Sequence, residues 1–236
     1  MTWHLEETRQ HINRLFGREQ LELAKPCIRS VVDRQMYARI HYQDAHAKID
    51  AYVSAELQEL SLLDVTFGDG EAWGEFNVFI RTVAAHLTAC VQSVHAVPDI
   101  LSHVLYFSLG LNRTSTALRS RDVNVATVLK LLKTDSLFSG LHGLLEGLVL
   151  GGSFKHLAAL ANQAKHRSIV FPTLSEDWTG EREERHAVVF PSFAYEGVVY
   201  PQVAVRDLLE PEYERSSRAV VETGQVLNAL LRRRMP

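Results

Sequence analysis

The stretch that decides the fold runs from Glu75 to Val97 and reads EFNVFIRTVAAHLTACVQSVHAV. Its apolar residues recur at intervals of three and four through about five turns, which is the pattern of a helix that buries one face. These positions are Phe76, Phe79, Ile80, Val83, Leu87, Cys90, Val91 and Val94. The stretch predicts a core helix, and it favours a mostly α-helical bundle for the chain.

Further helical patterns lie on both sides of this segment. Towards the N-terminus, Trp3–Leu23 and Pro26–Leu62 predict helices, and Pro26 is a residue that a first helical turn tolerates. The second of these carries an apolar stripe made of Ile28, Val31, Val32, Gln35, Met36, Ile40 and Ala47. Towards the C-terminus, Pro98-Asp99 is expected to start a new helix. The remaining predicted helices are Asn124–Lys133, Ser136–Leu150, Ser153–Arg167 and Pro211–Arg234.

The segment at about residues 168–205 has a different pattern. Ser168–Phe171 and Ala187–Phe190 are apolar runs followed by proline, which predict short strands. The dipeptide Glu196-Gly197 lies between two more such runs and predicts a hairpin turn. The charged stretch Ser175–Arg185 predicts an exposed loop. Such short strands cannot bury a core of their own, so we expect a small β appendage before the C-terminal helix.

The chain has 236 residues, which suits either one large domain or one domain with an N-terminal extension. Gly68-Asp69-Gly70 predicts a turn between two parts. Residues 1–70 are expected to form a helical extension or the first bundle helices. Residues 71–236 are expected to form a helical domain with the β segment inserted at about 168–205.

The composition is that of an ordinary globular protein, with 46% hydrophobic residues and a formal net charge of −3. This charge argues against non-specific coating of DNA, although a local basic site remains compatible with it. Cys27 and Cys90 are isolated, which predicts a reduced protein without a disulfide framework. The first residues form no apolar signal segment, and the apolar tracts are too short to span a bilayer. We therefore expect a cytoplasmic protein without a membrane segment.

Common catalytic and metal-binding motifs are absent from the sequence. It contains no HExxH pair, GxSxG elbow, Walker motif or dinucleotide fingerprint. Among the eleven histidines, His86, His95 and His103 are nine and eight residues apart, so one helical turn cannot bring them together. We expect neither a metal nor a cofactor.

Polar chemistry is concentrated in the run Asn162-Gln163-Ala164-Lys165-His166-Arg167, at the end of a predicted helix. Asn162 and His166 are four residues apart and share one face of that helix. An imidazole moves a proton near neutral pH and cations attract phosphate, so the run predicts a site for a phosphodiester. A structural interpretation competes with this one. Cations in a last helical turn add ~0.3–1 kcal/mol each, and Asn162 would then be a buried hydrogen-bonding residue.

The segment Leu160–Ser168, which follows a set of amphipathic helices, resembles the HEPN superfamily of all-α domains. The motif of that family is R-N-x-x-x-H on a late helix. Asn162 and His166 match its Asn and His, whereas Ala161 occupies the position of its Arg. In active members, the resemblance implies RNA cleavage without a metal, at a site that two protomers form together. It covers the chain from about Glu75 onward and implies a homodimer with the motif helix at its interface.

The resemblance leads to two hypotheses. In the first, the chain binds or cleaves RNA, in a bacterial defence or toxin-type system. His166 would then act as the base, Arg167 or Lys165 would steady the phosphate, and Asn162 would orient the imidazole. In the second, the chain is a non-catalytic interaction or regulatory subunit with a protein partner and a degenerate motif. An accessible Asn162–His166 pair favours the first hypothesis, and a buried, fully bonded pair favours the second.

Overall fold

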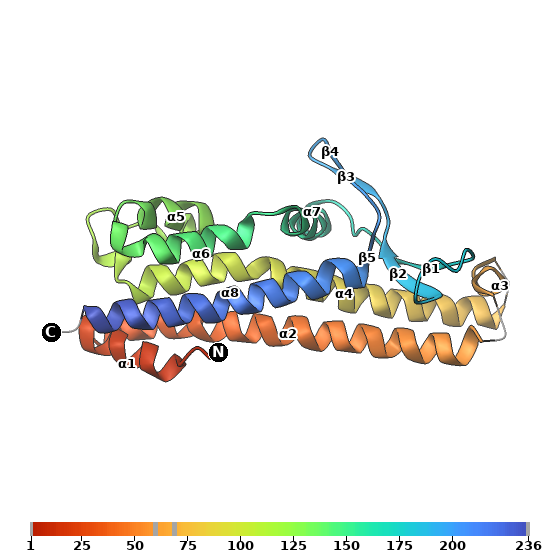
Figure 1. The fold of residues 1–236 in the computed structure, drawn as a ribbon, viewed down its shortest axis with the longest axis horizontal. Helices are drawn as coiled ribbons and strands as arrows, with labels where there is room; N and C mark the ends of the chain where they lie inside the picture. The colour runs from red at the N-terminus through yellow and green to blue at the C-terminus, as the bar shows by residue number, and fades with distance from the viewer. Residues whose placement is uncertain (1, 59–60, 68–69, 235–236) are drawn as a thin grey trace. The chain divides into compact units, whose positions relative to one another are not determined.

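A computed structural model describes residues 2–58, 61–67 and 70–234 (Figure 1). The chain is mostly α-helical, with short antiparallel strands before a long C-terminal helix, as the sequence predicts. The helices are α1 Leu5–Phe16, α2 Arg18–Glu56, α3 Leu62–Phe67, α4 Glu71–Ser108, α5 Val125–Lys133, α6 Ser139–Val149, α7 Gly152–His166 and α8 Val205–Arg233. The strands are β1 Thr173–Glu176, β2 His186–Phe190, β3 Phe193–Tyr195, β4 Val198–Tyr200 and β5 Val203–Ala204.

The described part of the chain forms two compact units. The first comprises residues 2–36, 94–155 and 213–234, and the second comprises residues 37–58, 61–67, 70–93 and 156–212. Segments that are distant in the sequence thus build each unit. The division near residue 70 that the sequence suggests stays a prediction about domains.

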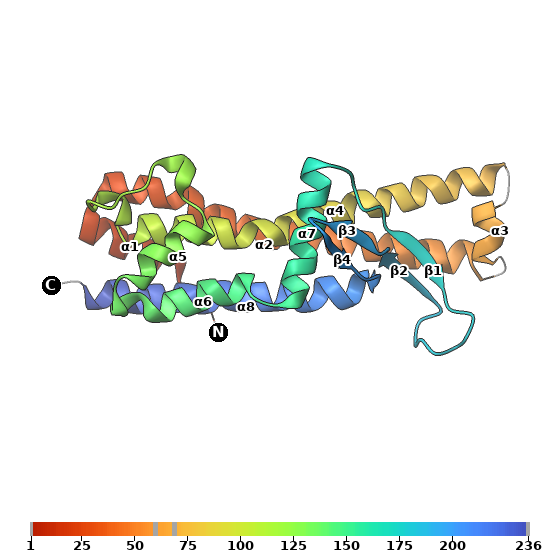
Figure 2. The same ribbon diagram turned by 90° about the horizontal axis from the view of Figure 1, so that it is seen from above.

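The first unit has an apolar core to which α1, α5 and α6 contribute together with parts of α2, α4 and α8. Its largest fully buried side chains include Ile12, Ile28, Leu101, Leu105, Tyr106, Leu132, Leu141 and Leu145. Gly17, at φ 85°, separates α1 from α2. Asn124 caps α5 in a capping box with Thr127, close to where the sequence places this helix. Helices α5 and α6 lie side by side in both views (Figures 1 and 2).

The second unit joins parts of α2, α4 and α8 to α3, most of α7 and all the strands. Figure 2 shows α3 between the facing ends of α2 and α4. Strands β1, β2 and β5 form an antiparallel sheet in the order β1-β2-β5, and β3 pairs with β4 as a separate hairpin. Gly68 and Asp69, at which the sequence predicts a turn, lie outside the described residues.

The hairpin prediction is confirmed, but one predicted strand is wrong. Phe193 pairs with Tyr200 and Tyr195 with Val198, around Glu196 at φ 50° and Gly197 at φ 80°. Two successive positive φ angles are those of a type I′ turn, whose twist suits a two-residue hairpin. The predicted strand Ser168–Phe171 is irregular, and pairing begins only after the following proline, with Thr173 opposite Val189. Ser175 and Glu176 belong to β1 and not to the predicted loop.

Three prolines at which the sequence predicts helix starts lie inside helices instead. Pro26 is within α2, Pro98 within α4 and Pro211 within α8. A proline inside a helix removes one backbone hydrogen bond and costs ~3 kcal/mol, so other interactions must offset it. Around Pro98, the buried residues Val97 and Leu101 continue the core stripe without a break. Burial of one uninterrupted face accounts for the continuity of the helix.

The role predicted for Asp99 is also corrected. Because α4 is continuous, Asp99 does not start a helix. Its carboxylate instead accepts a hydrogen bond from the backbone N–H of Val125, at 3.0 Å, which is the first residue of α5. Asp99 therefore accepts a hydrogen bond from a backbone N–H that has no partner within its own helix, and its negative charge is favoured at that helix N-terminus.

The buried face of α2 is not the predicted stripe. Ile28 and Val31 are buried as expected, but Val32, Met36 and Ile40 are exposed. The buried apolar positions are Ala24, Ile28, Val31, Ala38, Ala45 and Ile49. They recur at intervals of three, four and seven residues, which is the narrow apolar stripe typical of two closely packed helices. The small alanine side chains allow a neighbouring helix to approach closely.

Candidate functional site

Helix α7 carries the predicted site residues from a buried stretch out to solvent. His156, Leu157, Leu160 and Ala161 are buried, whereas Asn162 is half-buried. Lys165, His166 and Arg167, which follow one turn later, are exposed. The structure thus brings the predicted site residues together at the exposed end of α7.

Backbone hydrogen bonds cap the C-terminal end of α7. The N–H groups of Arg167 and Ser168 both donate to the carbonyl oxygen of Gln163, at 2.9 and 3.0 Å. Gln163 also donates from Nε2 to Ser168 Oγ at 3.2 Å. Among the described residues, the side chains of Asn162 and His166 form no hydrogen bond. An exposed imidazole, and not a buried bonded pair, is what the structure shows.

Arg167 lies over an aromatic ring that the sequence did not point to. Its guanidinium carbon is 5.2 Å from the centre of the Tyr195 ring, on strand β3. This is the distance of a cation–π contact, which contributes roughly 0.5–1 kcal/mol at an exposed site. Burial and the neighbouring Glu196 carboxylate raise the pKa of Tyr195, and Arg167 opposes that rise. The hairpin therefore adds an aromatic face to the basic end of α7.

A second contact between α7 and the hairpin involves His156, which sequence reasoning missed. The residue is 8% exposed, and its ring centre lies 5.6 Å from that of Phe193 and 5.2 Å from that of Tyr200. Its Nε2 atom is buried without a hydrogen-bond partner in the described part of the chain. Burial lowers the pKa of His156, so the neutral imidazole is favoured. The only signal in the sequence was a histidine within an apolar helical stretch.

The position that corresponds to the family arginine lies in the interior. Ala161 is 0% exposed, one residue before the half-buried Asn162. An arginine there would have to bury its charge, which is costly without a partner. The same end of α7 carries two cations, Lys165 and Arg167, and both are on the surface.

The described cavities do not contain the predicted site residues. The cavity next to this end of α7 measures about 10 Å³ and is lined by Leu160, Ala164, Ile169, Val170 and Phe190, together with residues of α4. This volume is about that of a single water molecule, so it cannot receive a nucleotide. Any ligand of Lys165, His166 and Arg167 would bind on an open surface.

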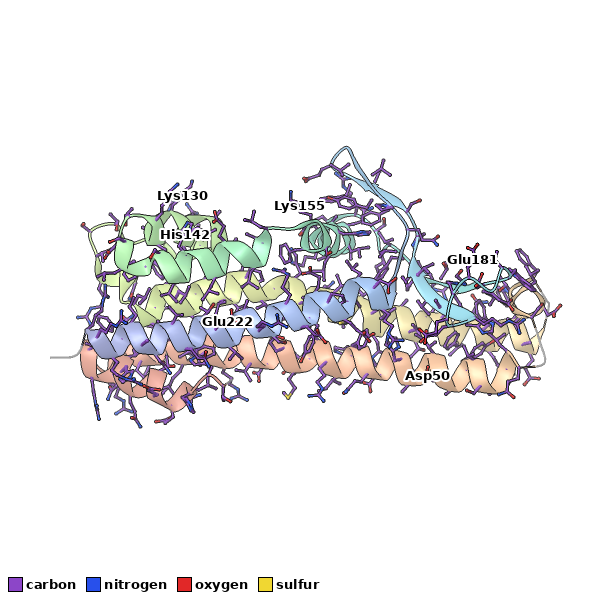
Figure 3. The ribbon with its side chains drawn as sticks, viewed as in Figure 1. Asp50, Lys130, His142, Lys155, Glu181 and Glu222 are labelled. Atoms are coloured by element: carbon purple, nitrogen blue, oxygen red, sulfur yellow. The ribbon has the colours of Figure 1, made fainter. Side chains whose placement is uncertain are left out.

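A larger groove of about 900 Å³ lies elsewhere in the second unit, beside His46. Its charged lining residues are Asp50, Glu183, Glu184, Asp207 and Glu210 against Arg182, Arg185 and Arg206. Asp50 on α2 is labelled in Figure 3. Arg206 bridges Glu184 at 2.6 Å and Glu210 at 3.4 Å. The excess of carboxylates makes this groove unsuitable for RNA.

A hydrogen-bonded pair lies at the inner side of that groove. Tyr42 donates to Glu210 at 2.6 Å, and its ring centre lies 4.2 Å from that of His46. The hydrogen bond from Tyr42 lowers the pKa of Glu210, and burial raises the pKa of Tyr42. Burial also lowers the pKa of His46. Because Tyr42 and Glu210 bond each other, we interpret this cluster as structural.

Glu176 links three segments of the second unit. Its side chain is 1% exposed and lies 2.6 Å from Arg185 and 3.6 Å from His186. It also accepts a hydrogen bond from the backbone N–H of Leu62 at 3.2 Å. Burial lowers the pKa of His186, although the Glu176 carboxylate opposes that shift. The acid thus joins β1, β2 and the start of α3.

The described residues contain neither a metal-binding cluster nor a single membrane-spanning helix. No group of three or more His, Cys, Asp and Glu side chains there is placed to hold a metal ion. No single described helix is long and apolar enough to cross a membrane. Only the bent pair Ser136–Val149 and Gly152–His166, taken together, meets that criterion by length and composition.

Comparison with family models, with curated proteins and with solved structures gave no match for this chain. The resemblance to the HEPN superfamily therefore rests on Asn162 and His166. It stays a prediction.

Proposed function

We propose that the chain binds single-stranded RNA at the exposed end of α7 together with the hairpin β3–β4. The observation that carries this proposal is the guanidinium of Arg167, 5.2 Å over the Tyr195 ring, next to the exposed His166. Single-stranded RNA is bound through phosphate contacts with cations and through stacking of its bases on aromatic and guanidinium planes. Lys165 and Arg167 supply the cations, and Arg167 with Tyr195 supplies the stacking surface.

Cleavage at this surface requires more than one protomer. His166 is exposed and can accept the proton of a ribose 2′-hydroxyl, and Arg167 can stabilise the charge on the phosphate. The buried Ala161 provides no cation at the position where the family has its arginine. A homodimer that brings two α7 ends together would double the number of cations and imidazoles at one phosphate. No metal takes part in this chemistry.

Binding is tested by fluorescence anisotropy with a labelled single-stranded RNA of about 20 nucleotides. Arg167→Ala and Tyr195→Ala are expected to weaken binding, the second by about fivefold or more, since stacking on one aromatic side chain contributes ~1–3 kcal/mol. Arg167→Ala should also reduce the slope of log K against log salt by ~0.7. Arg234→Ala is the matched control, because it removes a cation 5.0 Å over the Phe138 ring in the other unit. Equal effects of all three variants would contradict the proposal.

Catalysis is tested separately, with the same RNA and a metal chelator present. Wild-type protein should cleave it at neutral pH. His166→Ala should abolish cleavage and leave RNA binding within about twofold. Binding without any cleavage would retain the RNA-binding proposal and remove the nuclease.

The burial of Ala161 favours a second candidate function, that of a non-catalytic interaction or regulatory subunit. On this alternative, the His and Asn are remnants of the motif and a protein partner is the ligand. It predicts no RNA binding above that of the Arg167→Ala variant. The anisotropy experiment therefore separates the two functions.

A further inference from the structure

We propose that a groove between α2 and α4 in the second unit is the docking site for an amphipathic helix with a basic flank, supplied by another protein. The α2–α4 groove has a volume of about 790 Å³. It is lined on α2 by Lys48, Ala51, Tyr52 and Glu56, and on α4 by Glu71, Gly74, Glu75, Val78, Phe79 and Thr82. It shares no residue with the surface proposed to bind RNA, so the two proposals are independent.

Aromatic rings form the floor of the groove. Tyr52 and Phe79 stack with their centres 4.0 Å apart and their planes 8° apart. Phe76 lies beside both, at 5.9 and 6.1 Å. A preformed aromatic floor of this kind offers a large apolar contact area that needs little reorganisation on binding.

Several apolar side chains at this end of the second unit are exposed. Val78, which lines the groove, is 68% exposed, and Trp73 on the preceding turn of α4 is 49% exposed. Leu63 and Phe67 on α3, which lies at the same end of the helices (Figure 2), are also largely exposed. Exposed apolar groups that adjoin an apolar groove mark a surface that another protein covers.

The charges of the lining residues determine the kind of partner. Three carboxylates, those of Glu56, Glu71 and Glu75, face a single cation, that of Lys48. Glu56 and Glu75 are close enough to the Tyr52 hydroxyl to raise its pKa, together with its burial. Positive charge on the partner is therefore favoured, and nucleic acid is repelled. A second copy of the chain that docked by the same groove would bring carboxylates against carboxylates.

The dimensions fit a short helix. The lining residues on α4 extend from Glu71 to Thr82, a rise of ~16 Å at 1.5 Å per residue, which matches about three turns of a partner helix. Gly74 lies within this span, and a Cβ built there meets no described atom within 4 Å. The space above Gly74 is open for an apolar side chain of the partner, in the helix-in-groove mode of recognition.

The test uses the full-length chain and three fluorescein-labelled peptides of about 14 residues. The first peptide combines Leu and Lys with helical spacing, the second replaces each Lys with Glu, and the third contains the residues of the first in a scrambled order. The first peptide is expected to bind at least tenfold more tightly than the other two. Gly74→Arg, which fills the groove and adds a like charge, should weaken its binding at least tenfold.

The matched control is Gly143→Arg. Gly143 is also a helical glycine at which a Cβ meets no described atom within 4 Å, but it lies on α6 in the other unit. This variant should bind the first peptide within twofold of wild type. A second test variant, Glu75→Lys, should weaken binding about tenfold without filling the groove.

Several results would overturn the proposal. These are equal binding of the Leu/Lys and Leu/Glu peptides, equal binding of the scrambled peptide, and unchanged binding by Gly74→Arg. Absence of binding at millimolar peptide would do the same. Self-association of the chain that Gly74→Arg abolishes, measured by analytical ultracentrifugation, would assign the groove to a second copy instead.

Discussion

His156 connects α7 to the hairpin, and its replacement gives the most stringent check on the structure. In His156→Phe the six-membered ring keeps the contacts with Phe193 and Tyr200, whose centres are 5.6 and 5.2 Å away. The substitution removes the buried Nε2 atom, which has no partner among the described residues. A buried polar atom without a partner costs ~1–3 kcal/mol. Removal of this atom therefore stabilises the folded chain, although the slightly larger phenyl ring offsets part of the stabilisation. We expect the free energy of unfolding at pH 7 to rise by about 1 kcal/mol.

The same variant makes a prediction about pH. Burial lowers the pKa of His156, so at a pH below about 6.5 the unfolded chain binds a proton that the folded chain does not. The contribution of His156 to stability is therefore fully present above that pH and is lost progressively as the pH falls towards the lowered pKa. His156→Phe removes this loss, so the variant should gain on wild type by up to ~1.4 kcal/mol per pH unit within this window.

The assay is urea denaturation followed by circular dichroism at pH 7.5, 6.5 and 5.5. The difference between variant and wild type is the quantity to compare, because the pKa values of His46 and His186 are lowered as well. His156→Ala serves as the control and should cost about 2–4 kcal/mol, because it removes a ring that packs against two aromatic side chains. A loss of more than about 1 kcal/mol in His156→Phe at pH 7.5, or a difference that does not grow with acid, would refute the reasoning.

Three further predictions concern stability. Gly224→Ala should cost about 3 kcal/mol and shift the tryptophan fluorescence to the red, because a Cβ at this position overlaps the buried indole of Trp3. Burial of that indole contributes up to ~5 kcal/mol to stability. An unchanged spectrum would contradict this overlap. Tyr106→Phe should cost ~1–3 kcal/mol and speed hydrogen exchange of the Leu118 amide, since the buried hydroxyl accepts that N–H at 2.8 Å. Unchanged exchange would show that the bond contributes little. Glu176→Gln should lower the urea midpoint by the equivalent of ~1–2 kcal/mol, because it weakens a buried charged acceptor; a midpoint at or above that of wild type would argue against this role.

Much of the fold follows from patterns within short stretches of the chain. The spacing of apolar residues from Glu75 to Val97 is enough to identify α4 as a core helix. Gly197, between two short apolar runs, favours a hairpin turn because glycine accepts a positive φ angle without strain. Asn124 marks the start of α5 because its side chain satisfies a backbone N–H three residues later.

Other features depend on competition between local and long-range effects. A proline locally favours a boundary, yet Pro26, Pro98 and Pro211 lie within helices. The free-energy cost of losing one hydrogen bond is the same wherever the proline lies in a helix interior. The free energy gained by burying one continuous face depends on which other helices pack against it. The buried face of α2 differs from the predicted stripe for a similar reason. Alanines such as Ala38 become core residues only when a neighbouring helix comes close enough to cover them.

The candidate site also combines features that follow from local sequence with features that depend on the tertiary structure. The sequence by itself determined that Asn162, Lys165, His166 and Arg167 gather at one helix end, because helical periodicity places them there. Only the tertiary structure decided that Ala161 is enclosed and that Tyr195 lies beneath Arg167. The second fact depends on β3, which begins only at Phe193, whereas α7 ends at His166. The spacing of residues within a helix contains no information about which distant segment will cover it.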